Sequence, residues 1–315
     1  MRKGVLKGER METDRMNSYD AAYERAVRRL SDLSGMERKG FVHAYSMGDP
    51  MPSAEVLAEI IHLCRSVFFP GYYGKSSISE ATLPHEIGVA VSRLGSLLEE
   101  QIAAGLCFSS EESGVDFVSA QYRKAHDIAG RVIERLPEIR SLLETDVIAT
   151  YNGDPAAESV SQVISCYPAI RVMTVYRVAH ELLLEGVPLI PRIMTELAHS
   201  ETGIDIHPGA TIGSYFAIDH GTGVVIGETA RIGNHVKIYQ GVTLGAKSFD
   251  LDEKGNPVKG VARHPIIEDN VIIYSNATIL GRVTIGRGAV VGGNIWVTKS
   301  VEAGAQISQH KNKLD

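Results

Sequence analysis

The stretch Ile204–Gly245 reads IDIHPGATIGSYFAIDHGTGVVIGETARIGNHVKIYQGVTLG. Aliphatic residues recur in it at every sixth position, with two extra residues after Ile218, and the same spacing resumes further along the chain. The positions at this spacing are Ile206, Ile212, Ile218, Ile226, Ile232, Ile238, Leu244, Ile267, Ile273, Ile279, Ile285, Val291 and Val297. A sandwich or a helical bundle has no reason to keep such a period. A hexapeptide solenoid keeps it, because each unit is a short strand and a turn, and three units make one coil. We therefore expect a parallel β-helix with the aliphatic residues pointing inward.

The chain before this repeat has the periodicity of helices. Apolar residues follow helical spacing in Ala54–Phe69, which Pro70 and Gly71 end, and the pattern returns in 83–105, 117–136 and 167–185. The fold class that we expect is α+β in two parts. An α-helical domain covers residues 1–200, and a β-helix domain covers residues 201–315.

One segment, residues 246–265, interrupts the hexad. It is polar and rich in turn residues, so we expect an exposed excursion loop that leaves the coil. Such a loop either covers a binding site or decorates the solenoid, and its sequence alone does not separate the two.

Composition excludes several classes of protein. The 315 residues are 44% hydrophobic and 22% charged, which is typical of a globular chain, and the net charge is −6. That sign disfavours general binding to nucleic acid or to anionic membranes. No run approaches the roughly 18 apolar residues of a membrane span. Three isolated cysteines, and basic residues Arg2 to Arg10 with no apolar stretch after them, predict a cytoplasmic protein without a signal peptide.

His220 is the strongest candidate for acid–base chemistry. It lies with Asp219 at the irregularity of the repeat, where side chains are re-aimed, and histidine is the usual general base near neutral pH. Asp205 lies 15 residues earlier, roughly half a hexad from a position directly below His220 in a coil of about 18 residues. Asp205 either holds the imidazole in one tautomer or is a turn residue.

Two further motifs have alternative readings. Arg263 and His264 close the excursion loop, where an arginine either faces an anionic ligand or anchors the loop to a neighbouring acid. Asp154 precedes Pro155, a pair typical of a helix N-cap and first helical residue.

A metal site has little support. Histidines 207, 220, 235 and 264 are 13, 15 and 29 residues apart, and no cysteine lies in this half of the chain. We expect no metal.

Four motifs together resemble the serine O-acetyltransferase family, over roughly residues 145–300. They are Asp205-Ile206-His207-Pro208, Asp219-His220-Gly221-Thr222-Gly223-Val224-Val225-Ile226-Gly227-Glu228-Thr229, Gln240-Gly241-Val242-Thr243-Leu244-Gly245 and Arg263-His264-Pro265. The family joins a helical N-terminal domain to a left-handed β-helix. It transfers acetyl from acetyl-CoA to the hydroxyl of L-serine for cysteine synthesis.

The resemblance implies a role for each candidate. His220 is the general base and Asp205 orients it. Asp154 and Asp219 contact the ammonium group of serine, and Arg263, helped by His264, pairs with the carboxylate. The residues implied near the coenzyme groove are Gly245, Ser275 and Gly293.

The resemblance also implies partners. Acetyl-CoA is the co-substrate, L-cysteine is a feedback inhibitor, and the assembly is a homotrimer or a dimer of trimers. Family members that bind cysteine synthase do so through a C-terminal isoleucine, whereas this sequence stops at Leu314-Asp315, so we expect weak or no binding of that partner.

Two other functions fit the same repeat. One is a hexapeptide acetyltransferase for a different alcohol or amine, which has less need for both Asp154 and Arg263. The other is a non-catalytic β-helix scaffold, in which His220 is unimportant and acetyl-CoA does not bind.

Overall fold

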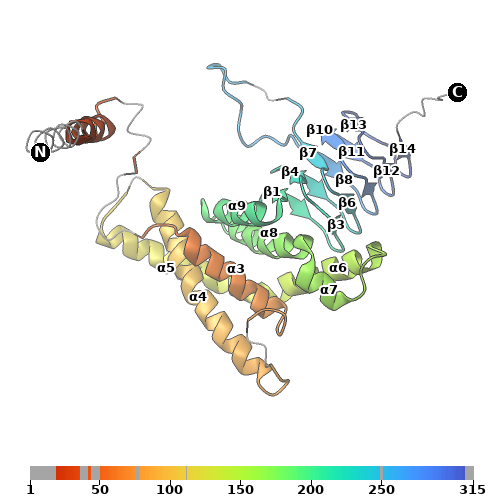
Figure 1. Cartoon of the computed structure of the whole chain (residues 1–315), viewed down its shortest axis with the longest axis horizontal. Coiled ribbons are helices and arrows are strands. Elements are labelled where there is room, and N and C mark those ends of the chain that lie inside the picture. The colour runs from red at the N-terminus through yellow and green to blue at the C-terminus, as the bar shows by residue number, and fades with distance from the viewer. Residues whose placement is uncertain are drawn as a thin grey trace, which may run out of the picture. The chain divides into compact units, whose positions relative to one another are not determined.

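Figure 1 shows the computed structural model of the chain, which describes residues 19–35, 42–43, 50–74, 78–110, 112–248 and 251–308. The chain divides into two compact units, residues 1–47 and residues 48–315. Residues 19–30 of the first unit form a helix. The basic N-terminal residues Arg2 to Arg10 and the C-terminal Leu314-Asp315, on which two sequence predictions depend, lie outside the described residues.

The second unit begins with helices and ends with a parallel β-helix. The helices are α3 (Ala54–Phe68), α4 (Leu83–Phe108), α5 (Val115–Glu134), α6 (Leu136–Gly153), α7 (Val160–Cys166), α8 (Pro168–Leu184) and α9 (Ile190–Thr202). The strands are β1 (Asp205–Ile206), β2 (Thr211–Ile212), β3 (Ala217–Asp219), β4 (Val225–Ile226), β5 (Arg231–Ile232), β6 (Lys237–Tyr239), β7 (Thr243–Gly245), β8 (Ile266–Ile267), β9 (Ile272–Ile273), β10 (Thr278–Leu280), β11 (Thr284–Ile285), β12 (Val290–Val291), β13 (Trp296–Val297) and β14 (Gln306–Ile307). The predicted fold class, helices followed by a β-helix of hexapeptide coils, is confirmed. The boundary near residue 200 stays a prediction, because both parts belong to one compact unit.

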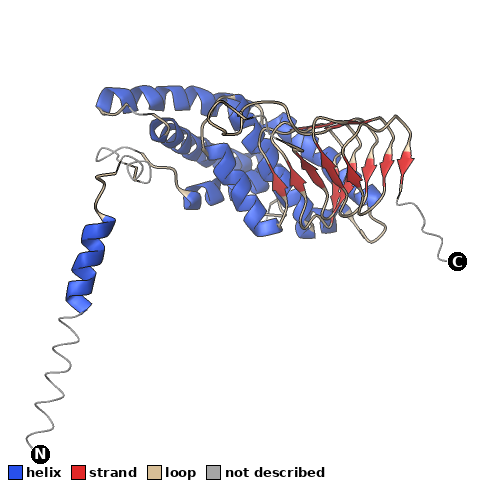
Figure 2. Cartoon of the chain, turned by 90° about the horizontal axis from the view of Figure 1, so that it is seen from above, coloured by secondary structure: helices blue, strands red, loops and turns tan. Residues whose placement is uncertain are grey.

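The strands form three parallel sheets, and successive coils lie side by side in Figure 2. The first sheet has the order β1-β4-β7-β10-β13, the second β11-β8-β5-β2 and the third β14-β12-β9-β6-β3. The hexad aliphatics point into the solenoid and are buried, as Ile238 and Ile279 show with no exposed surface. Between β7 and β8, the described residues 246–248 and 251–265 leave the coil, and Leu251 pairs with Pro257 inside this loop.

Two corners of the solenoid matter for the site. We call the turns from the third to the first sheet, residues 220–224, 240–242, 274–277 and 292–295, the Asp219 corner. We call the turns from the first to the second sheet, residues 207–210, 227–230, 246–265 and 281–283, the Arg263 corner. At the Asp219 corner the chain turns through left-handed backbone at Gly241, Asn276 and Asn294, which are residue types that tolerate this conformation.

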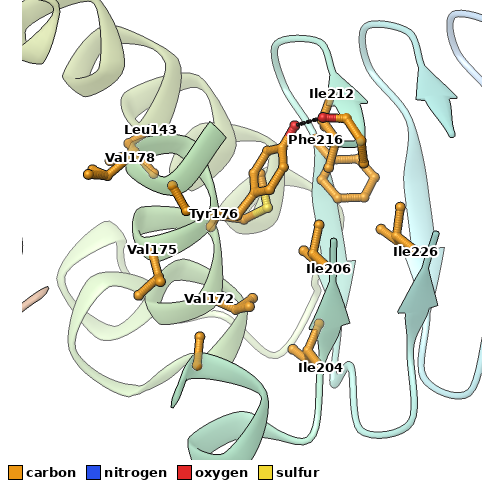
Figure 3. Packing of buried hydrophobic residues seen from close by; sticks show 14 of the residues in the cluster. Leu143, Val172, Val175, Tyr176, Val178, Ile204, Ile206, Ile212, Phe216 and Ile226 are labelled. Atoms are coloured by element: carbon orange, nitrogen blue, oxygen red, sulfur yellow. Dashed lines mark hydrogen bonds between the residues drawn. The ribbon is translucent and has the colours of Figure 1, made fainter. Parts of the chain in front are cut away.

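The helices pack on the first coil through an apolar layer. Tyr176 of α8 and Phe216, before β3, are both 1% exposed and lie between helix and solenoid in Figure 3. The Tyr176 hydroxyl donates to the Ala210 carbonyl at 2.6 Å, so its polar end is satisfied inside the layer.

A buried ion pair fixes the same contact. Arg177 of α8 donates to both carboxylate oxygens of Asp146 of α6, at 2.8 and 2.9 Å. Arg177 also donates to the Gly213 carbonyl at 2.9 Å, and the Phe216 amide donates to Asp146 at 3.0 Å. Two helices and the turn between β2 and β3 are therefore held by one network.

In the part of the chain that the structure describes, none of the helices is long and apolar enough to cross a bilayer.

The buried pair gives a stability prediction. We expect Asp146→Asn to lower the free energy of unfolding by about 3–5 kcal/mol, because it leaves the Arg177 guanidinium buried without a counter-charge. Urea unfolding measures the loss. The control is Glu144→Gln on the same helix, which breaks the exposed pair with Arg140 and should change stability by less than about 1 kcal/mol. Equal midpoints for both variants would contradict the anchoring role of Asp146.

Candidate active site

His220 lies in the turn that follows β3, at the Asp219 corner. The partners Ile206 and Ile226 are 20 residues apart, whereas Ile226 and Leu244 are 18 apart, so this first coil holds two extra residues. The turn absorbs them through left-handed backbone at His220, with φ 56°, and at Gly221. The extra residues leave the His220 side chain 77% exposed.

Asp219 lies between a histidine and a lysine. Its Oδ1 is 3.8 Å from His220 Nε2, and its Oδ2 is 3.0 Å from Lys237 Nζ. Lys237 also donates to the Gly153 carbonyl at 2.6 Å and lies over the Tyr239 ring, 4.5 Å from its centroid. The carboxylate is thus held on one side and open toward His220 on the other.

Asp154 joins this group from the end of α6. It is the C-cap residue of α6 and not a helix N-cap, because α7 begins only at Val160 after Ser159. Its Oδ1 accepts from the Ala156 amide at 2.8 Å, and its Oδ2 accepts from the Tyr167 hydroxyl at 2.6 Å. Each oxygen keeps a lone pair for a further donor.

The Asp154–Tyr167 hydrogen bond shifts both groups. Its hydroxyl donor, followed by the Ala156 amide, lowers the pKa of Asp154 below the ordinary value. The same bond, with some burial, raises the pKa of Tyr167 to about 12. Asp154 is therefore a carboxylate and Tyr167 a neutral donor at neutral pH.

The Arg263 corner holds a cation that is paired with a glutamate. Arg263 Nη2 donates to Glu228 Oε2 at 2.9 Å, and its side chain is 26% exposed. His264 lies directly over Gly227, where a Cβ atom would come 2.0 Å from the imidazole, so only glycine fits below the ring. The arginine and the imidazole therefore occupy neighbouring positions at the base of the excursion loop.

His264 has a defined tautomer. The Thr229 amide donates to its Nδ1 at 3.1 Å, so the proton lies on Nε2. Burial, followed by the charge of Arg263, lowers the pKa of His264 to about 4. His264 is a neutral hydrogen-bond donor near pH 7, not a second cation.

Asp205 lies on the first sheet, between the two corners. Register pairs it with Val225, and its nearest cation is Arg192 of α9, at 3.8 Å. Among the described residues, His220 has its ion-pair contact with Asp219 and none with Asp205. The orienting role of Asp205 stays a prediction.

Asp205 also belongs to a group with metal-ligand chemistry. Its carboxylate, that of Glu196 and a ring nitrogen of His199 lie within 4.8 Å of one another. Arg192 pairs with both Glu196 and Asp205, so a cation would have to displace a guanidinium there.

The candidate coenzyme residues divide between the corners. Ser275 and Gly293 stack at the Asp219 corner, where the Asn294 amide donates to the Ser275 carbonyl at 2.9 Å. Gly245 ends β7 on the far edge of the first sheet, beside the loop base. Within the described residues, Gln240 Oε1 at the Asp219 corner is buried and lacks a hydrogen-bond partner.

The structure thus brings Asp154, Asp219 and His220 together, and separately brings Arg263 and His264 together, at the two edges of one sheet. Sequence reasoning missed Lys237 and Tyr167. Coil spacing does not single out Lys237, because the register of this 20-residue coil pairs Lys237 with Ala217 and Asp219 with Tyr239.

Comparisons with known proteins agree on one family. The family model described as bacterial transferase hexapeptide (six repeats) matches residues 264–294. A Synechococcus elongatus protein named "Serine acetyltransferase, plasmid" is 50% identical over 268 residues, 84% of each chain. Entamoeba histolytica serine acetyltransferase 1, crystallised with L-cysteine, has a TM-score of 0.68 at 36% identity, covering 84% of this chain and 90% of that one. Neisseria gonorrhoeae serine acetyltransferase, crystallised with serine, has a TM-score of 0.52 at 26% identity, covering 80% of this chain and 95% of that one.

His264 gives a prediction about acid stability. Its pKa is 6.5 when unfolded and about 4 when folded, so between these values the unfolded chain binds a proton that the folded chain does not. Stability should fall as the pH drops through this window. Urea midpoints at about pH 7.5 and about pH 5 should show a smaller loss for His264→Gln than for the wild type.

The control is the exposed His126, whose pKa is raised by its hydrogen bond to Glu99. Its protonation favours the folded state, so His126→Gln should not reduce the loss. An equal loss in the wild type and His264→Gln would contradict a neutral, buried His264.

Proposed function

The chain belongs to the serine acetyltransferase family and acetylates the hydroxyl of L-serine, and we propose that acetyl-CoA is the acetyl donor. We also propose that the Asp219 corner and the Arg263 corner each bind one end of serine. The reaction gives O-acetyl-L-serine and CoA and serves cysteine biosynthesis. Family membership favours serine over other acceptors and an enzyme over a scaffold.

The observation that carries the proposal is the charge of the two corners. Serine is a zwitterion, so its site needs an anionic contact for the ammonium group and a cationic one for the carboxylate. Asp154 and Asp219 supply the first at one corner. Arg263, with a neutral Nε2–H donor from His264, supplies the second at the other.

His220 is the proposed general base. It accepts the proton of the serine hydroxyl as the oxygen attacks the thioester carbonyl, because a free alcohol is a poor nucleophile. The tetrahedral intermediate then collapses, the carbon–sulfur bond breaks, and the imidazolium returns the proton to the leaving CoA thiolate. Asp219, 3.8 Å from His220 Nε2, stabilises the imidazolium between these steps.

The donor arm fits the Asp219 corner. The turns at Ser275 and Gly293 continue the column of turns that begins at His220. Gln240 lies one coil above His220, and its buried Oε1, without a partner among the described residues, suits an amide N–H of the pantetheine arm. This arrangement supports acetyl-CoA as co-substrate, with its thioester near the base; Gly245 then lines the other edge of the groove.

The separation of the corners supports a trimer. One chain carries His220 and Arg263 on opposite edges of its first sheet, so a complete serine site forms when the Asp219 corner of one chain meets the Arg263 corner of the next. A head-to-tail contact of this kind closes into a ring. A homotrimer, alone or as a dimer of trimers, satisfies this geometry.

L-cysteine is the proposed feedback inhibitor. It carries the same ammonium and carboxylate groups as serine and differs at the reacting atom, so both corners hold it equally well. The Entamoeba histolytica neighbour was crystallised with L-cysteine.

The remaining parts of the proposal are the location and the metal. Cys64, Cys107 and Cys166 are free thiols, which suits the cytoplasm. Proton transfer by His220 and pairing by carboxylate and guanidinium groups account for the chemistry without a metal.

The first test of this function is His220→Ala. We expect serine-dependent CoA release from acetyl-CoA, followed with a thiol-reactive dye, to fall about 10²–10⁴-fold in kcat/KM. The matched control is His126→Ala, because the side chains of His126 and His220 are 75% and 77% exposed. Full activity in His220→Ala would overturn the base assignment, and release with an amino sugar but not serine would overturn the acceptor.

Mixed assemblies test the shared site. Chains with His220→Ala and chains with Arg263→Ala should each be nearly inactive alone. Co-expressed in equal amounts, they should regain about a quarter of the wild-type activity per site, because one interface in four joins two intact corners in a cyclic trimer. No recovery in mixed trimers confirmed by mass would place both residues in a site within one chain.

A further inference from the structure

Lys237 is a charged residue that no role described so far requires. It lies at the start of β6, its side chain is 18% exposed, and it points along the outer face of the third sheet. Three groups surround its ammonium: Asp219 Oδ2 at 3.0 Å, the Gly153 carbonyl at 2.6 Å and the Tyr239 ring. A lysine held by three partners has given up most of its rotamer freedom.

These contacts join two separate parts of the ammonium site. Asp219 belongs to the solenoid, whereas Gly153 is the last residue of α6 and directly precedes Asp154. A Cβ atom on Gly153 would lie 3.6 Å from the Lys237 side chain, which is ordinary van der Waals contact, so the lysine packs directly on the end of α6. Lys237 therefore bridges the helix end that carries one carboxylate and the strand that carries the other.

The charge of Lys237 is maintained in place. Burial opposes it, yet the interactions with Tyr239 and Asp219 raise the pKa of Lys237 above its ordinary value. With Lys237 charged, Asp154, Asp219 and Lys237 together carry one net negative charge. That balance matches a single ammonium group better than two unpaired carboxylates do.

We propose that Lys237 is a positioning residue for the acetyl transfer, which holds Asp154 and Asp219 at the spacing of one ammonium group and masks part of the Asp219 charge from His220. This inference rests on the proposed function of the Asp219 corner. Lys237 contacts Asp219 and the end of α6 that precedes Asp154, and it does not contact the reacting atoms.

The masking has a defined consequence for the base. Two carboxylates act on His220: Asp219, with Oδ1 3.8 Å from Nε2, and Asp154, whose lowered pKa owes a part to the His220 charge. Lys237 lies against the other oxygen of Asp219, at 3.0 Å. Removing the lysine charge leaves the Asp219 carboxylate unbalanced, 3.8 Å from the imidazole. The imidazolium form of His220 then gains stability relative to the neutral form.

The test is Lys237→Met, which keeps the length of the side chain and removes its charge. We expect the KM for serine to rise roughly tenfold, equivalent to losing one good hydrogen-bonded contact, with the KM for acetyl-CoA unchanged. We also expect the acidic limb of the kcat/KM profile to move to higher pH by about half a unit, a small shift because His220 is exposed. Lys237→Arg should keep the limb in place, and Lys124→Met, on the surface of α5, should match the wild type.

Two further variants separate charge from structure. In Asp219→Asn the charge that Lys237 masks is already absent, so adding Lys237→Met should produce no further movement of the limb. A shift of the same size in the Asp219→Asn background would overturn the masking role. Unchanged serine KM and limb in Lys237→Met would overturn the whole proposal.

An activity-independent readout distinguishes this inference from the proposed function. NMR titration of the His220 imidazole in the wild type and in Lys237→Met reports the pKa without turnover. A higher His220 pKa in Lys237→Met supports the charge effect, whether or not the protein acetylates serine. Absence of acetylation with acetyl-CoA and serine would count against the proposed function and not against the charge effect. An identical titration in both proteins would contradict the masking role.

Discussion

The buried pair between Asp146 and Arg177 is the contact on which the site depends. It joins α6 and α8 and ties both to the turn between β2 and β3, through Gly213 and Phe216. Asp146 lies on α6 eight residues before Asp154, about 12 Å along a helix. The pair therefore fixes where the end of α6, which carries Asp154, meets the solenoid, which carries Asp219.

The solenoid was predictable from sequence because its constraint is repetitive. Each inward-pointing side chain packs on the equivalent side chain one coil away, so only an aliphatic residue fits there. An inward position of this kind occurs every six residues. Ile238 and Ile279, which the spacing selects, are fully buried. The excursion after Gly245 was visible for the same reason, since polar residues cannot occupy inward positions.

The helical half and the details of the site were less predictable. Asp146 and Arg177 have the sequence pattern of ordinary charged helix residues, and only tertiary packing makes them a buried pair. Lys237 and Tyr167 act through contacts between distant segments, from β6 to the end of α6 and from α8 to Asp154. The register of the first coil was visible in the sequence, because the two extra residues after Ile218 place Asp219 opposite Tyr239, but that register does not show that the Lys237 side chain reaches Asp219.

The division of charge between two corners gives the proposed enzyme its directionality. A zwitterion held between an acidic and a basic corner can lie in only one orientation. In that orientation the ammonium end lies beside Asp219, and the hydroxyl, two bonds from the ammonium-bearing carbon, is within reach of His220. A rigid solenoid is well suited to this task, because backbone hydrogen bonds between coils hold each corner in place where it meets the neighbouring chain. In the proposed trimer, substrate binding therefore requires assembly of the subunits. A chain without its neighbour has the general base His220 but lacks the Arg263 corner that binds the carboxylate of serine.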